Sequence, residues 1–235
     1  MADVDGPLER AASLLEDAER HGEQGRFEDA ERLAIEAKNL VPGNRQACAE
    51  IDLFRARSLL KAKKLDEGVR NLAAILTEYA DWFRNPESRE VYEMVQLQRA
   101  FSLVHLERNE KALPLLEEAL SFQLEREVQS DLHCHLGRCY HELAFYQLAR
   151  GQFERANALS VSEEWQPAFH YYYGYTLYEL KEFQRAKREF ILSVQSGPSG
   201  PEPTLRYSML AAVSRRLGEH SEARSYDEKA KSLKR

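Results

Sequence analysis

Hydrophobic and polar residues alternate with the period of an α-helix along nearly the whole chain. Between residues 167 and 200, Tyr173, Leu177 and Leu180 fall at i, i+4 and i+7, which is one face of a helix. A second face follows, with apolar or small residues at spacings of three and four: Phe183, Ala186, Phe190 and Val194. The stretch therefore predicts two amphipathic helices that pack as a hairpin, with the small Gly174 where they meet.

The same two-helix unit recurs along the chain. Each copy aligns on a small residue near the start of its second helix: Ala30, Gly68, Ala112, Ala149, Ala186 and Ala223. The copies lie about 37 residues apart, a period typical of helix-turn-helix repeats. Asn109 and His220 replace an expected aromatic residue and Gly68 replaces an alanine, so we expect these copies to pack less tightly. Pro114 is expected near the start of its helix, where proline is least disruptive.

Three segments carry a resemblance to a known family. They are Gly25-x-Phe27-x-x-Ala30 with Ala37 and Pro42 beyond it, Leu136-Gly137-x-x-Tyr140, and Gly174-x-x-Leu177 followed by Phe183-x-x-Ala186. These segments resemble the tetratricopeptide repeat (TPR) family. Together with the periodicity, the resemblance implies an all-α fold, a right-handed α-solenoid of about six TPR helix-turn-helix repeats. We predict a single TPR solenoid domain over residues 1–235, with repeats at about 11–44, 49–82, 93–126, 130–163, 167–200 and 204–235.

The resemblance also implies which side chains face a partner, because first helices line a concave groove in this family. Carried over to this chain, the partner-binding candidates are Arg57, Phe101, His105, Arg138, His141, Tyr171, Tyr175 and Tyr178. The three tyrosines are spaced four and three apart and form one stripe. Tyrosine suits a groove because its ring packs while its hydroxyl stays hydrated.

Two interpretations of the tyrosine stripe stay open. In the first, the stripe and the nearby arginines hold an extended or helical peptide with an apolar anchor and a carboxylate. In the second, the tyrosines only contact neighbouring first helices and face solvent. Family members that hold chaperone C-terminal tails use Lys and Asn at groove positions where this chain has Leu15, Glu19 and Leu53, so we expect no such chaperone partner.

These features predict a non-enzymatic protein–protein interaction scaffold or adaptor that binds a peptide or partner helix in the concave groove. One alternative is a rigid structural subunit or spacer in a larger complex. Another is weak homo-association, head to tail, because the first repeat is acidic and the end of the last helix is basic. The chain has no nucleophile elbow and no phosphate-binding glycine loop, so we predict no catalytic residue.

A cluster of histidines and cysteines is the one candidate for metal binding: His133, Cys134, His135, Cys139 and His141. A zinc or copper site needs ligands that converge from more than one element. The cluster falls on one predicted helix, with the cationic Arg138 among its members. We therefore expect these residues to divide between core and groove, with no metal and no cofactor.

Composition narrows the class of partner and the location. The net charge of −6 disfavours a nucleic-acid binder, whose surface should cluster Lys and Arg. The three cysteines lack the spacing of a disulfide framework, which favours reduced thiols in a cytoplasmic protein. The first residues lack the pattern of a secretory signal, and no apolar run approaches the length needed to cross a membrane, so no membrane association is expected.

Overall fold

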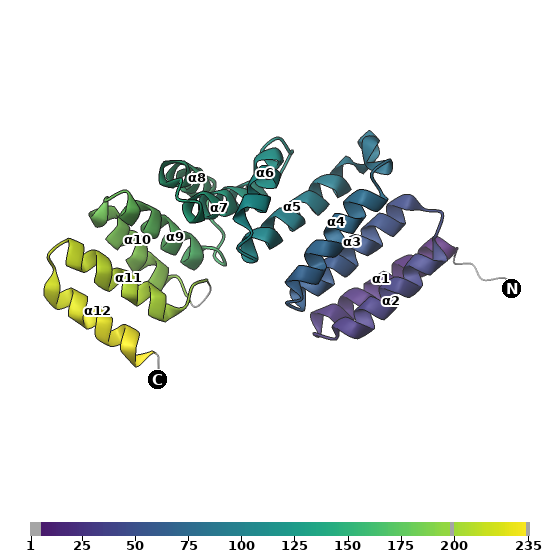
Figure 1. Ribbon diagram of the computed structural model, residues 1–235. Coiled ribbons are helices and arrows are strands. Elements are labelled where there is room, and N and C mark those ends of the chain that lie inside the picture. The colour runs from purple at the N-terminus through teal and green to yellow at the C-terminus, as the bar shows by residue number, and fades with distance from the viewer. Residues whose placement is uncertain (1–5, 198–199, 234–235) are drawn as a thin grey trace. The chain divides into compact units, whose positions relative to one another are not determined.

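The computed structural model describes residues 6–197 and 200–233, and no strand occurs in these ranges (Figure 1). The α-helices are α1 (Pro7–Glu23), α2 (Phe27–Leu40), α3 (Arg45–Lys61), α4 (Leu65–Glu78), α5 (Arg89–His105), α6 (Asn109–Ala119), α7 (Arg126–Glu142), α8 (Tyr146–Leu159), α9 (Gln166–Glu179), α10 (Phe183–Gln195), α11 (Pro203–Arg216) and α12 (His220–Ser232). Two short 3₁₀ helices, η1 (Trp82–Arg84) and η2 (Pro86–Ser88), precede α5. The predicted all-α fold is confirmed.

Consecutive helices pack as hairpins, visible in Figure 1 as neighbouring ribbons joined by short turns: α1 with α2, α3 with α4, α7 with α8, α9 with α10, and α11 with α12. The chain divides into two compact units, Met1–Leu115 and Leu116–Arg235, here called unit 1 and unit 2. In unit 1, α3 packs against α2, α4 and α5. In unit 2, α9 packs against both α7 and α11, so these three first helices lie side by side in succession. The second helices α8, α10 and α12 pack against them.

The helix bounds differ from the predicted repeats in two respects. The first four first helices begin at Pro7, Arg45, Arg89 and Arg126, about one helical turn before the predicted repeat starts. Pro114 lies near the middle of α6 and not near its start, because α6 begins at Asn109. In the part of the chain that the structure describes, no helix is both long and apolar enough to cross a membrane.

All six turns within the hairpins use one backbone geometry. A residue two positions before each second helix has a positive φ, from 58° at Glu107 to 79° at Gly218. Around it, two hydrogen bonds close the end of the first helix, as in the donation by Ala144 N to His141 O (2.9 Å) and by Phe145 N to Tyr140 O (2.8 Å). This pair of bonds is the Schellman motif, which satisfies helix-end carbonyls.

Two glycines let the helices of a hairpin approach closely. A Cβ atom at Gly137 of α7 would lie 2.7 Å from the Phe153 ring of α8, and one at Gly174 of α9 would lie 3.1 Å from the Phe190 ring of α10. Both rings are fully buried. The glycines therefore leave room for the aromatic residues at the centre of each hairpin, as the sequence pattern predicted for Gly174.

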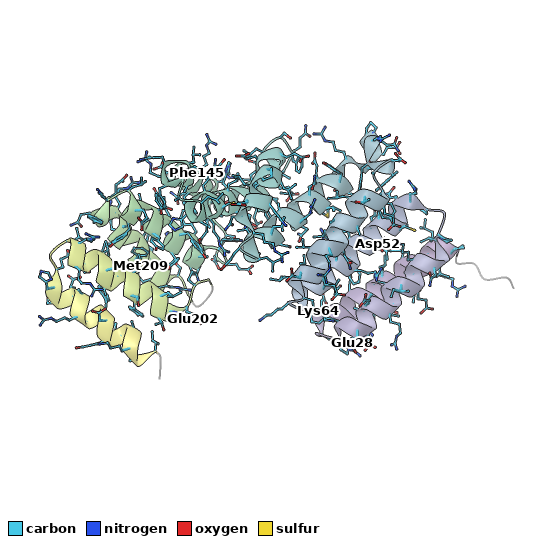
Figure 2. The ribbon with its side chains drawn as sticks, in the orientation of Figure 1. Glu28, Asp52, Lys64, Phe145, Glu202 and Met209 are labelled. Atoms are coloured by element: carbon cyan, nitrogen blue, oxygen red, sulfur yellow. The ribbon has the colours of Figure 1, made fainter. Side chains whose placement is uncertain are left out.

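A buried carboxylate lies in unit 1. Asp52 of α3 (Figure 2) accepts hydrogen bonds from Tyr79 Oη at 2.8 Å and from Lys38 Nζ at 2.5 Å. Arg55 donates to its other oxygen at 3.3 Å. Burial and the carboxylate raise the pKa of Tyr79. A buried charge is costly unless it is paired and hydrogen-bonded, and these partners satisfy the Asp52 carboxylate. The network also joins α2, α3 and the end of α4.

Candidate functional site

An open depression of about 270 Å³ lies on the surface of unit 2. We call it the tyrosine pocket, and its lining residues are His141, Glu142, Tyr146, Tyr171, Tyr172, Tyr175, Pro201 and Leu205. They come from the end of α7, the start of α8, the middle of α9, and α11 with the connector before it. The pocket is therefore assembled from successive hairpins within one unit.

His141 is at the centre of the aromatic residues in the pocket. Its ring centroid lies 4.7 Å from that of Tyr175, 5.5 Å from that of Tyr146 and 6.2 Å from that of Tyr172. These separations fall within the range at which aromatic rings attract one another through edge and face contacts. The histidine thus holds tyrosines from two helices around one opening.

Burial keeps His141 neutral. Its side chain is only 7% exposed, and burial lowers its pKa from 6.5 to about 4. His141 Nδ1 lies 3.0 Å from Thr176 Oγ1, and that hydroxyl donates to the carbonyl of Tyr172. Because the hydroxyl hydrogen is used in this way, the threonine oxygen accepts the Nδ1 hydrogen of the imidazole. His141 therefore supplies a fixed, uncharged ring.

The predicted tyrosine stripe on α9 divides into three environments. Tyr171 is 8% exposed and packs against Phe190, and burial raises its pKa to about 12. Tyr175 is half-buried and faces the pocket. Tyr178 is half-buried beyond it, where its hydroxyl accepts a hydrogen bond from Arg216 Nε at 3.1 Å. Tyr171 is thus packed in the core, whereas Tyr175 keeps accessible surface.

The other predicted residues lie in both units. Arg138 of α7 has its guanidinium 5.0 Å from the ring centre of Tyr172, which borders the pocket. Arg57, Phe101 and His105 belong to unit 1, on α3 and α5. Arg57 is half-buried and burial lowers its pKa, while the charge of Glu19 acts in the opposite direction. The structure therefore brings His141, Tyr171 and Tyr175 together in the pocket, with Arg138 beside it.

Sequence reasoning missed two of the tyrosines that line the pocket. Tyr146 is the first residue of α8, a second helix, whereas the groove candidates were taken from first helices. Tyr172 lies between two predicted groove and core positions on α9 and was assigned to neither. The position of Tyr146 directly after the turn could have identified it. In any hairpin the start of the second helix lies next to the end of the first helix, where His141 is.

A glycine and an arginine fix the residues just before α11 against the neighbouring helices. Gly200 has φ +81°, and a Cβ atom there would lie 2.9 Å from Ala168 of α9. Arg206 is 1% exposed and donates to Pro201 O at 2.7 Å, to Ser193 O at 2.8 Å and to Gly197 O at 2.6 Å. These contacts set the position of Pro201 at the edge of the pocket.

The histidine and cysteine cluster is part of the packing of α7. Cys134, Cys139 and His135 are buried, with the His135 ring 4.5 Å from that of Trp165. His133 Nδ1 lies 2.7 Å from Gln152 Oε1. Burial raises the pKa of Cys139 to about 11, so its thiol is protonated near neutral pH. Within residues 6–197 and 200–233, no three His, Cys, Asp or Glu side chains are grouped to hold a metal ion.

Comparison with known proteins identifies the fold. No family model matches the sequence, and no curated protein sequence matches it. Among solved structures, the chain is similar to that of Pseudomonas aeruginosa pilF. The TM-score is 0.70 and the identity 20%, and the match covers 97% of this chain and 94% of that one.

Two further structures extend the similarity. PilW, described as a widely conserved type IV pilus biogenesis factor, has a TM-score of 0.70 and 15% identity, over 94% of this chain and 92% of that chain. YrrB, described as a TPR protein with an unusual peptide-binding site, has a TM-score of 0.56 and 15% identity, over 80% of this chain and 87% of that chain. At these identities the similarity shows the fold alone. The predicted resemblance to TPR proteins is thus confirmed as a helical-hairpin solenoid fold.

Proposed function

We propose that this chain is a non-enzymatic protein-interaction scaffold that holds a peptide or partner helix at the tyrosine pocket of unit 2. The observation that carries the proposal is the pocket itself. It opens to solvent and is lined by four tyrosines and a neutral histidine from α7, α8 and α9. Tyrosine is enriched at binding hot spots because it offers a large rigid surface with a polar end.

The exposure of the individual tyrosines favours binding over packing alone. Tyr171 is buried and already part of the core, whereas Tyr146 and Tyr175 keep accessible surface at the opening. Rings that only completed the core would be covered by the neighbouring helices. The similarity of the fold to YrrB, whose description names a peptide-binding site, supports the same class of function.

The proposal is tested by selecting peptides from a random library displayed on phage and measuring their affinity. We expect selected peptides to bind the wild type, and Tyr146→Ala with Tyr175→Ala to weaken binding about tenfold or more, because each ring is a candidate hot spot. The matched control is Tyr207→Ala with Tyr226→Ala. These tyrosines stack on each other between α11 and α12 and neither lines the pocket, so we expect their replacement to leave binding unchanged.

Thermal melting of each variant separates a binding defect from unfolding. The pocket variant should remain folded with a modestly lower melting temperature, because its two half-buried rings contact His141. The proposal is contradicted if no peptide is selected. It is equally contradicted if selected peptides bind the pocket variant as well as the wild type, since the binding surface would then lie elsewhere.

A further inference from the structure

The charged side chains around the tyrosine pocket are already engaged with groups of the chain. Arg138 lies over the ring of Tyr172, 5.0 Å from its centre. Arg216 donates to the hydroxyl of Tyr178 at 3.1 Å. Glu142, which lines the pocket, also interacts with another group of the chain. Recognition at the pocket therefore depends on aromatic rings and hydroxyls more than on the charge of a partner.

Two phenol hydroxyls at the pocket make no hydrogen bond within the described residues. They belong to Tyr146 and Tyr175, which are half-buried, line the opening and flank the His141 ring. Elsewhere a tyrosine hydroxyl donates to a carboxylate of the chain, as Tyr140 does to Glu117 at 2.6 Å. Burial raises the pKa of Tyr146 and of Tyr175, so both hydroxyls keep their hydrogens near neutral pH. The pocket thus presents two donors that the described part of the chain does not use.

Another part of the pocket lining is apolar. Pro201 belongs to the connector before α11, and Leu205 of α11 is 49% exposed. Proline has no N–H group, and the carbonyl of Pro201 already accepts a hydrogen bond from Arg206 at 2.7 Å. One of the chain's own prolines therefore borders the tyrosines, where it offers a partner mainly apolar surface.

These features favour one peptide conformation over another. In an α-helix, the interior carbonyls are bonded to N–H groups of the same helix, so they are not free to accept from the tyrosines. A polyproline II segment has no internal hydrogen bonds, and its carbonyls stay available. Proline also lacks the N–H group that would lose its water against Pro201 and Leu205. The donors and the apolar surface at the pocket thus favour the same kind of segment.

We propose that the tyrosine pocket binds a proline-rich segment of a partner in the polyproline II conformation, an inference that rests on the proposed peptide-binding function. The proline rings pack on the faces of Tyr146 and Tyr175, and neighbouring backbone carbonyls accept hydrogen bonds from their hydroxyls. A polyproline II segment is already ordered before it binds, so it loses little conformational entropy in the pocket. The occupant is therefore an extended segment and not a partner helix.

The test uses short fluorescent peptide pools with blocked ends and no charged residue. The central positions read Pro-Pro-x-Pro-Pro in one pool, and alanine or leucine replaces every proline in two others. An uncharged amphipathic peptide of about 15 residues, long enough to form a helix, represents a partner helix. Affinity for the full chain is measured by fluorescence anisotropy. We expect the proline pool to bind about tenfold or more tightly than each of the other probes.

Removal of the two hydroxyls tests the hydrogen bonds separately from the rings. Tyr146→Phe with Tyr175→Phe keeps both rings, so the protein should stay folded, and thermal melting checks this. We expect the proline pool to bind this variant about fivefold or more weakly, because two carbonyls lose their donors. The matched control, Tyr207→Phe with Tyr226→Phe, removes two hydroxyls from tyrosines that do not line the pocket and should leave the affinity unchanged.

The outcomes separate this inference from the function on which it rests. If the leucine pool or the helical peptide binds as tightly as the proline pool, and loses affinity in Tyr146→Ala with Tyr175→Ala, the pocket binds peptides but the inference is overturned. Unchanged affinity of the proline pool for Tyr146→Phe with Tyr175→Phe overturns it as well. If no probe binds but library-selected peptides do, the inference fails alone, and if neither binds, the proposed function fails with it.

Discussion

At the scale of single residues, His141 joins the core of unit 2 to the pocket. Its ring contacts Tyr146 and Tyr175, and its Nδ1 atom is bonded to Thr176. Burial favours the neutral imidazole, which lowers its pKa to about 4. A histidine in this state makes the folded protein sensitive to acid, because the unfolded chain binds a proton more readily.

We predict that His141 reduces stability as the pH falls. Its pKa is about 6.5 in the unfolded chain and about 4 in the folded one, so its neutral form contributes fully above pH 6.5. Between these two values the unfolded state gains protons first, and the free energy of unfolding should decrease by up to about 3 kcal/mol. The measurement is urea unfolding at several pH values, compared between the wild type and His141→Gln.

The variant serves as the control for other acid-sensitive groups. His141→Gln keeps a polar side chain without a titrating ring, so its stability should depend less on pH between 6.5 and 4. Equal pH dependence in the two proteins would show that His141 is already solvated in the folded state.

At the scale of elements, the six hairpin turns share a left-handed residue, yet only two of these residues are glycines. Gly25 and Gly218 adopt the conformation freely, whereas Lys63, Glu107, Ala144 and Lys181 have φ values between 58° and 63°. A side chain with a Cβ atom is strained there by about 1 kcal/mol. The Schellman bonds hold the conformation in spite of this strain, since they satisfy carbonyls that the helix ends leave open.

We predict that Lys63→Gly stabilises unit 1 by about 1 kcal/mol or less, because the relief of strain exceeds the added flexibility of the unfolded chain. Lys63 is exposed and its φ is 60°. The control is Ala74→Gly in α4, which should destabilise by about 1 kcal/mol because glycine is disfavoured within a helix. Urea unfolding is followed by the fluorescence of Trp82 in a Trp165→Phe background. A destabilising Lys63→Gly would mean that its aliphatic stem contributes to packing.

At the scale of the whole molecule, each unit has its own core and its own tryptophan. Trp82 lies in unit 1 and Trp165 in unit 2. In a stack of repeats each element mainly contacts its neighbours, so local damage can remain local. Arg206 is a suitable place to test this, because its three bonds to carbonyls join α10, the connector and α11 within unit 2.

We predict that Arg206→Met destabilises unit 2 by about 3 kcal/mol, because it leaves one buried and two part-buried carbonyl groups without this donor. The shift in the urea midpoint should be large for Trp165 and less than half as large for Trp82, each measured with the other tryptophan replaced by Phe. Arg188→Met, at an exposed position of α10, is the control. Equal shifts at both reporters would indicate one cooperative domain, as the sequence-based assignment of residues 1–235 expects.

The repeating helices could be predicted because their signal is local. The 3.6-residue period and the aligned small residues recur in each copy, and a glycine such as Gly137 can be recognised from the pattern alone. Helix starts were less certain, as at Arg126, because the first turn of a helix contributes little to the apolar stripe. Pro114 was misplaced because α6 is short, Asn109–Ala119 with 11 residues, so that residue 114 falls at its middle.

The sequence by itself determined the helices, their pairing and the stripe of Tyr171, Tyr175 and Tyr178, because side-chain direction on a helix follows from spacing. Only the tertiary structure decided which of these tyrosines is covered, and that Tyr146 and Tyr172 join them. It also decided the neutral state of His141 and the bonding of Arg206. The physical reason is that burial and charge at a given residue depend on the neighbouring hairpin and its connector, which the spacing within one helix does not encode.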